Sequence, residues 1–266
     1  MSVTFDAATA RLRLDADAFI TLVEYATDRE GACDDVVERL SDAGAVADGA
    51  PHPVLRNALA AVTSSRGSLQ VLVTGPDGVR LHQAWVAFVS AMLTDLADGT
   101  YDFAAVSTEF VPTTIAQLTG LQGRPRLDAA SAVVDESLLD DLASNSASAR
   151  ADGGEALADL LAPWPRASAA VRAGHWQLSV VDIAFQARER TLVRRLAWVD
   201  TDAGLLRVEA DEHGPALVPT TSTALWRAVV SILPTDAETD TTTGTETGTE
   251  TGVGTDSGTD SEAKSA

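Results

Sequence analysis

One stretch of the chain matches a later stretch at a constant distance, and this internal repeat constrains the possible folds more than any other feature. Residues 69–121 align without a gap to residues 176–228, an offset of 107, and 10 of the 53 aligned positions are identical. The clearest block is Val-Pro-Thr-Thr at 111–114 over the same letters at 218–221. Proline is favoured at the first position of a helix, so each block is expected to open one. Two copies of one unit predict a quasi-twofold fold; chance similarity between two proline-initiated helices is the alternative.

Within each copy, the hydropathy pattern predicts helices, then strands, then a helix. In the first half we expect helices at 15–27, 33–43 and 52–66, strands at 69–74, 79–86, 88–96 and 101–106, and a helix opened by Pro112. In the second half we expect helices at 133–142, 156–161 and 167–171, a mobile loop at 144–154, strands at 176–183, 191–199 and 204–210, and a last helix opened by Pro219. The expected fold class is therefore α+β, with two antiparallel meanders flanked by helical bundles. One domain is expected over residues 1–234, built of two related halves at about 10–122 and 123–234.

Charge separates a C-terminal tail from the rest of the chain. The net charge is −20, and residues 235–266 contribute eight acids, one base (Lys264), eleven threonines and five glycines. A segment this poor in apolar residues cannot bury enough surface to fold, so a disordered acidic tail is expected at 235–266. It is interpreted as a solubilising extension, with an interaction tail as the alternative. An acidic surface repels phosphate, so neither nucleic acid nor an anionic membrane is an expected partner.

The localisation expected from the sequence is cytoplasmic. The chain has no apolar run long enough for a transmembrane helix and no basic-then-apolar segment typical of a secretion signal. Its one cysteine, Cys33, cannot form an internal disulfide, as in proteins of a reducing compartment.

Residues that carry chemistry are sparse. The four histidines lack the spacing of metal ligands, and no nucleophile elbow, dinucleotide fingerprint or phosphate-binding loop occurs. No catalytic residue, metal site or cofactor is therefore expected, and a protein that binds another protein is the favoured class. Carboxylates are abundant, and their spacing singles out no catalytic pair, so an enzyme with an unrecognised site stays open as an alternative.

Arginines gather at one place in this acidic chain. Four lie within eight residues: Arg188, Arg190, Arg194 and Arg195. They are interpreted either as a partner-facing hairpin, because guanidinium forks suit carboxylates, or as members of local salt bridges, and the second interpretation is slightly favoured. Trp198 and Trp226 are added as partner-binding candidates, although tryptophans in a sheet or helix more often belong to the core.

The order of elements resembles the EspG family, the cytoplasmic chaperones of type VII (ESX) secretion in actinobacteria. The residues that carry the resemblance are the helix and turn at 38–44, the helix from His52, the strand at 69–73, the strand pair at 199–206 and the end at 218–234. The resemblance covers about residues 10–234. It implies a quasi-twofold α+β fold and binding of a helical, aggregation-prone secretion substrate of the PE/PPE kind at its hydrophobic tip. No contact residue of the family matches position by position, and the acidic tail is not part of the pattern.

The function expected is that of a non-enzymatic cytoplasmic chaperone, which needs no cofactor and keeps a helical secreted client soluble. A different cytoplasmic interaction protein, such as one that neutralises a toxin, is the alternative. The client's identity and the oligomeric state are not predicted.

Overall fold

The computed structural model describes residues 3–27, 33–128, 130–187, 190–212, 214–235 and 238. The α-helices are α1 (Ala16–Ala26), α2 (Asp34–Asp42), α3 (Arg56–Thr63), α4 (Val111–Leu118), α5 (Glu136–Ala143), α6 (Ala147–Leu160), α7 (Pro165–Arg172) and α8 (Ser222–Ile232). The strands are β1 (Thr4–Asp6), β2 (Arg11–Leu14), β3 (Val46–Ala47), β4 (Ala50–Pro51), β5 (Gly67–Gly75), β6 (Gly78–Val86), β7 (Val89–Asp95), β8 (Tyr101–Ser107), β9 (Ala132–Val133), β10 (Trp176–Ala187), β11 (Arg190–Thr201), β12 (Gly204–Asp211) and β13 (Gly214–Thr220). Two 3-10 turns, η1 (Pro53–Leu55) and η2 (Thr108–Phe110), precede α3 and α4.

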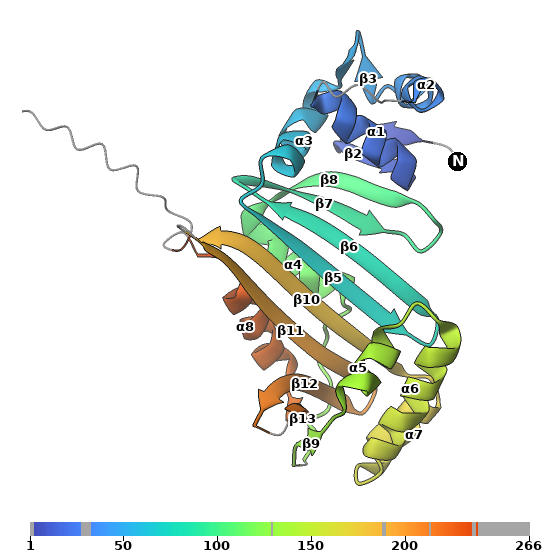
Figure 1. The fold of residues 1–266 in the computed structure, drawn as a ribbon, viewed down its shortest axis with the longest axis vertical. Coiled ribbons are helices and arrows are strands. Elements are labelled where there is room, and N and C mark those ends of the chain that lie inside the picture. The colour runs from blue at the N-terminus through green and yellow to red at the C-terminus, as the bar shows by residue number, and fades with distance from the viewer. Residues whose placement is uncertain are drawn as a thin grey trace, which may run out of the picture.

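The strands form one long antiparallel sheet in the order β1-β2-β8-β7-β6-β5-β10-β11-β12-β13-β9, and β3 pairs with β4 separately (Figure 1). Two meanders, β5 to β8 and β10 to β13, meet through the β5–β10 pair at the centre. Each meander is followed by a helix, α4 in the first half and α8 in the second. The α+β class expected from the sequence is confirmed, and the order of elements repeats.

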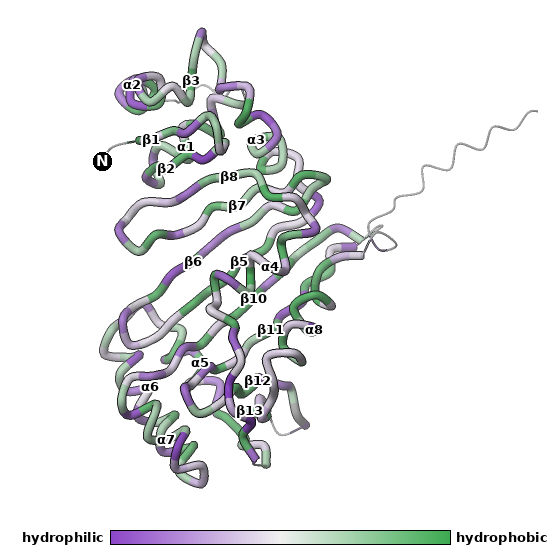
Figure 2. Tube along the Cα trace, turned by 180° about the vertical axis from the view of Figure 1, so that it is seen from behind, coloured by the Kyte–Doolittle hydropathy of each residue, from purple (hydrophilic) through white to green (hydrophobic). Residues whose placement is uncertain are grey.

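One face of the sheet is covered by α4 and α8, which contact each other (Figure 2). Alternate strand residues such as Val71, Val181 and Trp198 point into this layer and form one core with Ile115 of α4 and Val229 of α8. Every one of these side chains is essentially inaccessible to solvent. This layer spans both halves, so it ties the two meanders together beneath their junction.

The opposite face carries two separate helical clusters. The first packs α1, α2 and α3 against the outer strands of the first meander, where Leu93 and Phe103 are buried. The second packs α5, α6 and α7 against the second meander, where Leu178 and Leu206 are buried. Because successive residues of a strand alternate between faces, Leu93 lies on the face opposite Met92, which belongs to the α4–α8 core. The two clusters leave the middle of the sheet between them (Figure 1).

The gapless alignment at an offset of 107 does not match the repeat of the fold. It places Val71 over Leu178, but Val71 faces the α4–α8 core and Leu178 faces the opposite cluster. An odd shift of register sends every side chain of a strand to the other face, so these residues are not equivalent. The strands of the β10–β11 hairpin have twelve residues each and those of β5–β6 have nine, so no single offset fits both strands and helices.

The two Val-Pro-Thr-Thr blocks also differ. Val111 and Pro112 begin α4, as predicted, but Pro219 lies in β13 opposite Leu206. Only Ala216 and Leu217 of β13 pair with β9, so Pro219 sits on a stretch whose outer side has no described strand, where its missing N–H costs no ladder bond. Helix α8 begins at Ser222 instead, capped by the Thr221 hydroxyl, which accepts from the Ala224 N–H at 3.2 Å.

The prediction of a mobile loop at 144–154 is wrong, because most of these residues belong to α6. Gly153 and Gly154 let this helix approach its neighbours closely: a Cβ at Gly153 would lie 3.1 Å from Asp141, and one at Gly154 would lie 3.2 Å from the Trp176 indole. Arg150 of the same helix is buried and donates to the carbonyls of Gly75 at 3.1 Å and Ser144 at 2.9 Å. Tertiary packing therefore overrides the weak local helix propensity of the two glycines.

An ion pair fixes the connection between the halves. Arg124 follows α4, and its Nε lies 2.8 Å from Oδ1 of Asp200 at the end of β11, while its Nη1 lies 3.1 Å from Asp202. The Asp200 side chain is only 7% exposed. Burial raises the pKa of Asp200 despite the neighbouring guanidinium.

The tail predicted at 235–266 lies outside the described residues, apart from Thr235 and Glu238. No helix in the described part of the chain is both long and apolar enough to cross a membrane.

Candidate functional site

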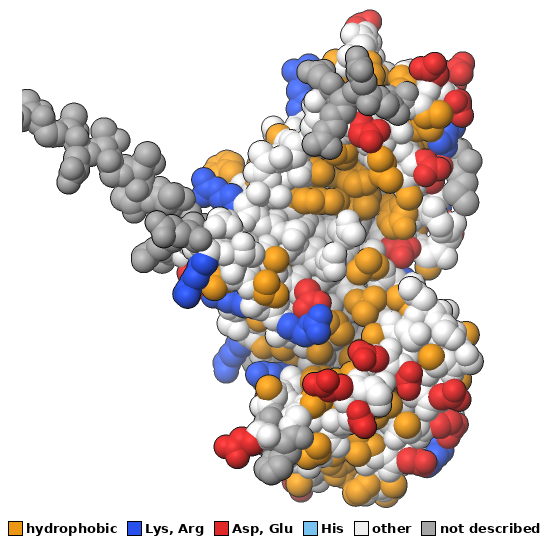
Figure 3. Space-filling view, in the orientation of Figure 1, with side chains coloured by type: hydrophobic (Ala, Val, Ile, Leu, Met, Phe, Trp, Pro, Cys, Tyr) orange, Lys and Arg blue, Asp and Glu red, His pale blue; other side chains and the backbone are white. Residues whose placement is uncertain are grey.

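The middle of the sheet presents an uncovered surface between the two helical clusters, which we call the open sheet face (Figure 3). It is built of three rows of side chains that cross β6, β5, β10 and β11 in register. The central row is polar and consists of Gln83, Gln70, Asp182 and Arg195. The rows on either side are Leu81, Leu72, Val180 and Ala197, and Trp85, Ser68, Ala184 and Val193.

Apart from Ser68, the two flanking rows give the open sheet face an apolar character around its polar centre. Val193 is 70% exposed and Leu81 is 39% exposed, which is unusual for aliphatic side chains on the central strands of a sheet. At the margin of the same face, a cavity of about 690 Å³ separates α5 from β11 and β12. Leu139, Ala197 and Val208 line it, with Asp140 and Arg195 among its polar lining. Such a surface suits a partner with an apolar projection and some polar groups.

Arg195 stands on the open sheet face and binds Asp182 of the neighbouring strand through two contacts. Its Nε donates to Oδ1 at 2.6 Å and its Nη2 donates to Oδ2 at 2.9 Å. The hydrogen bond that Arg195 donates to Asp182 raises the pKa of the Arg195 guanidinium. The side chain of Arg195 is still 71% exposed, so a partner can reach the cation while Asp182 holds its orientation.

Arg194 points to the other face and is used within the chain. Its guanidinium donates to the carbonyls of Ile232 and Leu233 at 3.3 Å each, and so caps the C-terminal end of α8. It also lies over the Phe185 ring, 4.9 Å from the centroid, and pairs with Glu238. Hydrogen bonds from Thr235 and Arg194 lower the pKa of Glu238 to about 2.

The arginines that are grouped in the sequence therefore do not form one surface cluster in the described structure. Arg194 and Arg195 have carboxylate partners in their own chain, Glu238 and Asp182, which agrees with the salt-bridge interpretation of these two. Arg190 begins β11 and is exposed, with no carboxylate partner among the described residues, and Arg188 lies outside them. The sequence could not show these partners, because one acid lies on the preceding strand and the other 44 residues further along.

The two tryptophan candidates lie on the face of α4 and α8. Trp198 is fully buried in the core beneath α8, so its side chain cannot meet a partner on this surface and the core interpretation holds. Trp226 lies on α8 and is 37% exposed. A single partner seated on the open sheet face cannot contact Trp226, because the sheet lies between them.

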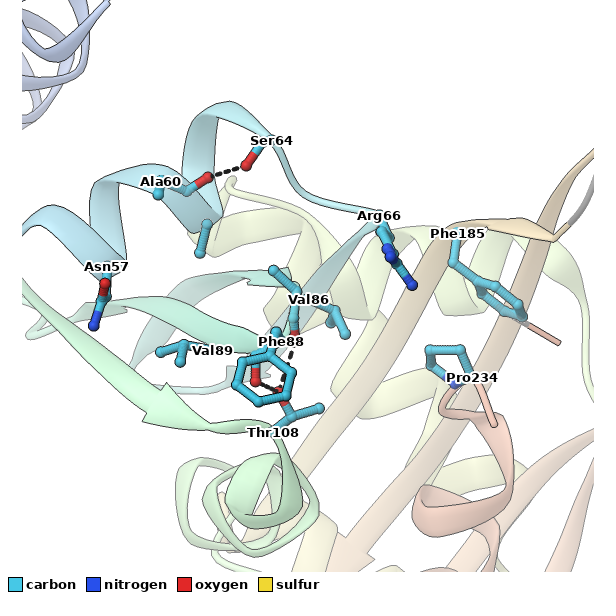
Figure 4. A pocket seen from close by; sticks show the side chains of 13 residues that line it. Asn57, Ala60, Ser64, Arg66, Val86, Phe88, Val89, Thr108, Phe185 and Pro234 are labelled. Carbon is cyan, nitrogen blue, oxygen red and sulfur yellow. Dashed lines mark hydrogen bonds between the residues drawn. The ribbon is translucent and has the colours of Figure 1, made fainter. Parts of the chain in front are cut away.

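A second cavity, of about 630 Å³, lies where β5 begins and β10 ends, beside α3 and the chain that follows α8 (Figure 4). Ala60, Gly67 and Val86 line its wall, and Pro234 borders it. The turn between β6 and β7 places Phe88 at its rim with 99% of the residue exposed. Neither Phe88 nor the polar row of Gln70 and Gln83 was predicted from the sequence as a site. The alternation of the strands would have put Gln70 and Gln83 on one face, but their alignment with Asp182 depends on a pairing distant in sequence.

No group of three or more His, Cys, Asp or Glu side chains in the described ranges is arranged to hold a metal ion. What the geometry offers is recognition: an apolar surface with one oriented cation, bordered by two helical clusters.

Comparison with known proteins bears on the fold. No family model matches the chain, and no curated protein matches it. Among solved structures, the chain is similar to the type VII secretion system chaperone EspG5 of Mycobacterium tuberculosis, in complex with the PE25–PPE41 dimer. The similarity covers 84% of this chain and 97% of that chain, with a TM-score of 0.54 and 14% sequence identity. The chain therefore has an EspG-like fold.

Proposed function

We propose that this protein is a cytoplasmic chaperone of type VII secretion that binds a helical secretion substrate of the PE/PPE kind and keeps it soluble until export. The observation that carries the proposal is the likeness of fold over nearly the whole length of EspG5, a secretion chaperone whose structure was solved with a PE–PPE dimer. The role is one of binding, and it needs neither a reaction nor a cofactor.

We propose the open sheet face as the surface that receives the client. Its apolar rows and the cavity beside α5 would cover an apolar helix tip, which is an aggregation liability while it is exposed. Arg195 would meet a carboxylate or a helix C-terminal carbonyl of the client, because its guanidinium is oriented by Asp182 and still exposed. Among the grouped arginines that the structure describes, Arg195 is the one that we propose for this role.

The first test is capture of the client. The full chain is tagged and purified from its native host, and co-purifying proteins are identified by mass spectrometry. We expect a small helical secreted protein. Recovery of a toxin, with no such secreted protein, would refute the chaperone proposal and favour the alternative of a toxin-neutralising partner.

The second test separates the two faces of the sheet. Val193→Asp puts a charge on the open sheet face, and Val230→Asp makes the same change on the exposed side of α8, where Val230 is 46% exposed. We expect Val193→Asp to weaken client binding at least about tenfold, and Val230→Asp to leave it nearly unchanged. Equal effects of the two variants, with both folded by circular dichroism, would refute the open sheet face as the client site.

A charge swap tests Arg195 without leaving a carboxylate unpaired. Asp182→Arg combined with Arg195→Asp keeps the ion pair but exchanges its ends across two neighbouring strands. We expect weaker client binding with unchanged stability, because the client then meets the charge at the wrong position. Unchanged affinity would mean that the cation at Arg195 is not part of recognition.

A further inference from the structure

The chain that follows α8 turns back against the end of the sheet. Arg194 on β11 donates to the last carbonyls of α8 and pairs with Glu238. The carboxylate of Glu238 also accepts from the backbone N–H and the hydroxyl of Thr235, at 3.0 Å each. Pro234 borders the cavity at this end. The acidic segment therefore starts in contact with the folded domain, on an arginine.

More cations lie at the same end, and no described acid neutralises them. Arg66 and Arg190 are both exposed, and neither has a carboxylate partner among the described residues. They are close in the sheet, because the Arg66 carbonyl accepts from Gln186 at 2.9 Å and the neighbouring Ala187 pairs with Arg190. Two neighbouring cations without a described carboxylate partner attract acids from elsewhere in a chain whose net charge is −20.

The residues that follow Glu238 have the complementary charge. Six acids occur over the next 24 residues: Asp240, Glu246, Glu250, Asp256, Asp260 and Glu262. Arg190 lies four residues from Arg194 along β11, which corresponds to about 13 Å in a strand. An extended chain covers that distance in about four residues, so the segment after Glu238 can reach Arg190 and then Arg66.

We propose that residues 239–262 occupy this arginine end of the domain, continuing the contact that Glu238 makes with Arg194 through further ion pairs to Arg190 and Arg66. The segment then acts as an intramolecular competitor that shields the two arginines from the carboxylates of other proteins. Only a partner that binds this end more strongly than the tethered acids would displace it. The inference does not depend on the identity of the client or on the open sheet face.

The test uses the full chain and its single native cysteine. Cys33→Ser removes that thiol, and Thr249→Cys introduces one in the acidic segment for a nitroxide spin label. Paramagnetic broadening of backbone amides is then measured at Arg66 and Arg190, and at α7 as a distant reference. The matched control carries the same label with the six acids changed to Asn or Gln, which keeps the tether length and removes the charge.

Exposed ion pairs are weak. At low salt we therefore expect the ratio of bound to free segment to be only about fivefold higher for the acidic segment than for the neutral control. The difference should vanish in about 1 M NaCl, where the Debye length falls to about 3 Å. Arg66→Gln with Arg190→Gln should lower the broadening to the level of the neutral control, and Arg166→Gln on α7 should not. Equal broadening with acidic and neutral segments at low salt, or a difference between them that persists at high salt, would overturn the proposal.

Discussion

Removal of Arg124 should expose how strongly one ion pair supports the junction of the halves. Arg124→Met leaves the Asp200 carboxylate, 7% exposed, without its cation. Loss of one partner of a buried pair costs about 3–5 kcal/mol, and the 22% exposure of Arg124 places this case near the lower end. For a domain of this size, about 3 kcal/mol lowers the melting temperature by about 6–12 °C. Thermal and urea unfolding of the full chain would measure the loss.

The same variant should acquire a pH dependence with a definite sign. Burial already raises the pKa of Asp200 above its ordinary value, and without the guanidinium the pKa rises further. An acid whose folded pKa lies above its unfolded pKa binds more protons in the folded state, so the variant loses stability as pH rises. We therefore expect the deficit of Arg124→Met to be largest at pH 7 to 8 and to shrink toward about pH 5.

Two further variants make this reasoning refutable. Asp200→Asn added to Arg124→Met removes the buried charge and should restore most of the lost stability. Arg166→Met, at an exposed arginine of α7 with no carboxylate partner among the described residues, should change stability by less than about 0.5 kcal/mol. A deficit that is independent of pH, or one that Asp200→Asn fails to reduce, would show that Arg124 acts through its packing rather than its charge.

Three other predictions concern a buried histidine, a tight glycine and the net charge. Burial lowers the pKa of His82 to about 4, so the stability that the neutral imidazole contributes should be lost as pH falls below about 6.5 toward 4. His82→Gln keeps an acceptor for the Asp95 N–H and should flatten the urea midpoint as a function of pH in that range; an unchanged profile would contradict this role. At Gly67 a Cβ would lie 2.8 Å from the Phe185 Cβ and 2.9 Å from the Ala184 carbonyl oxygen, so Gly67→Ala should lower the free energy of unfolding by about 1–3 kcal/mol. Gly123→Ala, at an open position, should change it little, and equal losses in unfolding assays would refute the steric argument. Because a net charge of −20 repels itself in the compact state, the melting temperature should rise between about 0.1 and 2 M KCl, and a fall would show that the internal ion pairs outweigh the repulsion.

Much of the local structure follows from the sequence, because it depends on alternation and on capping residues. The strands that match β5 to β8, the helix capped by Asp15 and the helix opened by Pro112 were all predictable in this way. The elements that were predicted wrongly are those whose conformation depends on long-range packing. Helix α6 contains two glycines that only its contacts with α5 and Trp176 justify. Strand β13 takes up Pro219 because few residues pair with its outer side.

The candidate site was less accessible to sequence reasoning than the fold. Alternation along β11 puts Arg194 and Arg195 on opposite faces, and it puts Val193 on the same face as Arg195. It could not reveal that Asp182 and Glu238 supply the carboxylates, since neither lies within the arginine cluster. The open sheet face itself arises from the β5–β10 pairing, which joins residues more than 100 positions apart, such as Leu69 and Ile183.

That pairing also has a consequence for synthesis of the chain. Until β10 has been made, β5 is the free edge of the first meander, and its backbone N–H and C=O groups from Gly67 to Thr74 have no partner on that side. Such an edge is a template for strands of other molecules. A nascent first half is therefore prone to self-association, and an isolated first half is expected to form dimers or larger aggregates that pair edge to edge through β5. The release of the second half from the ribosome allows β10 to pair with β5, so the same step that joins the two meanders also removes this exposed edge.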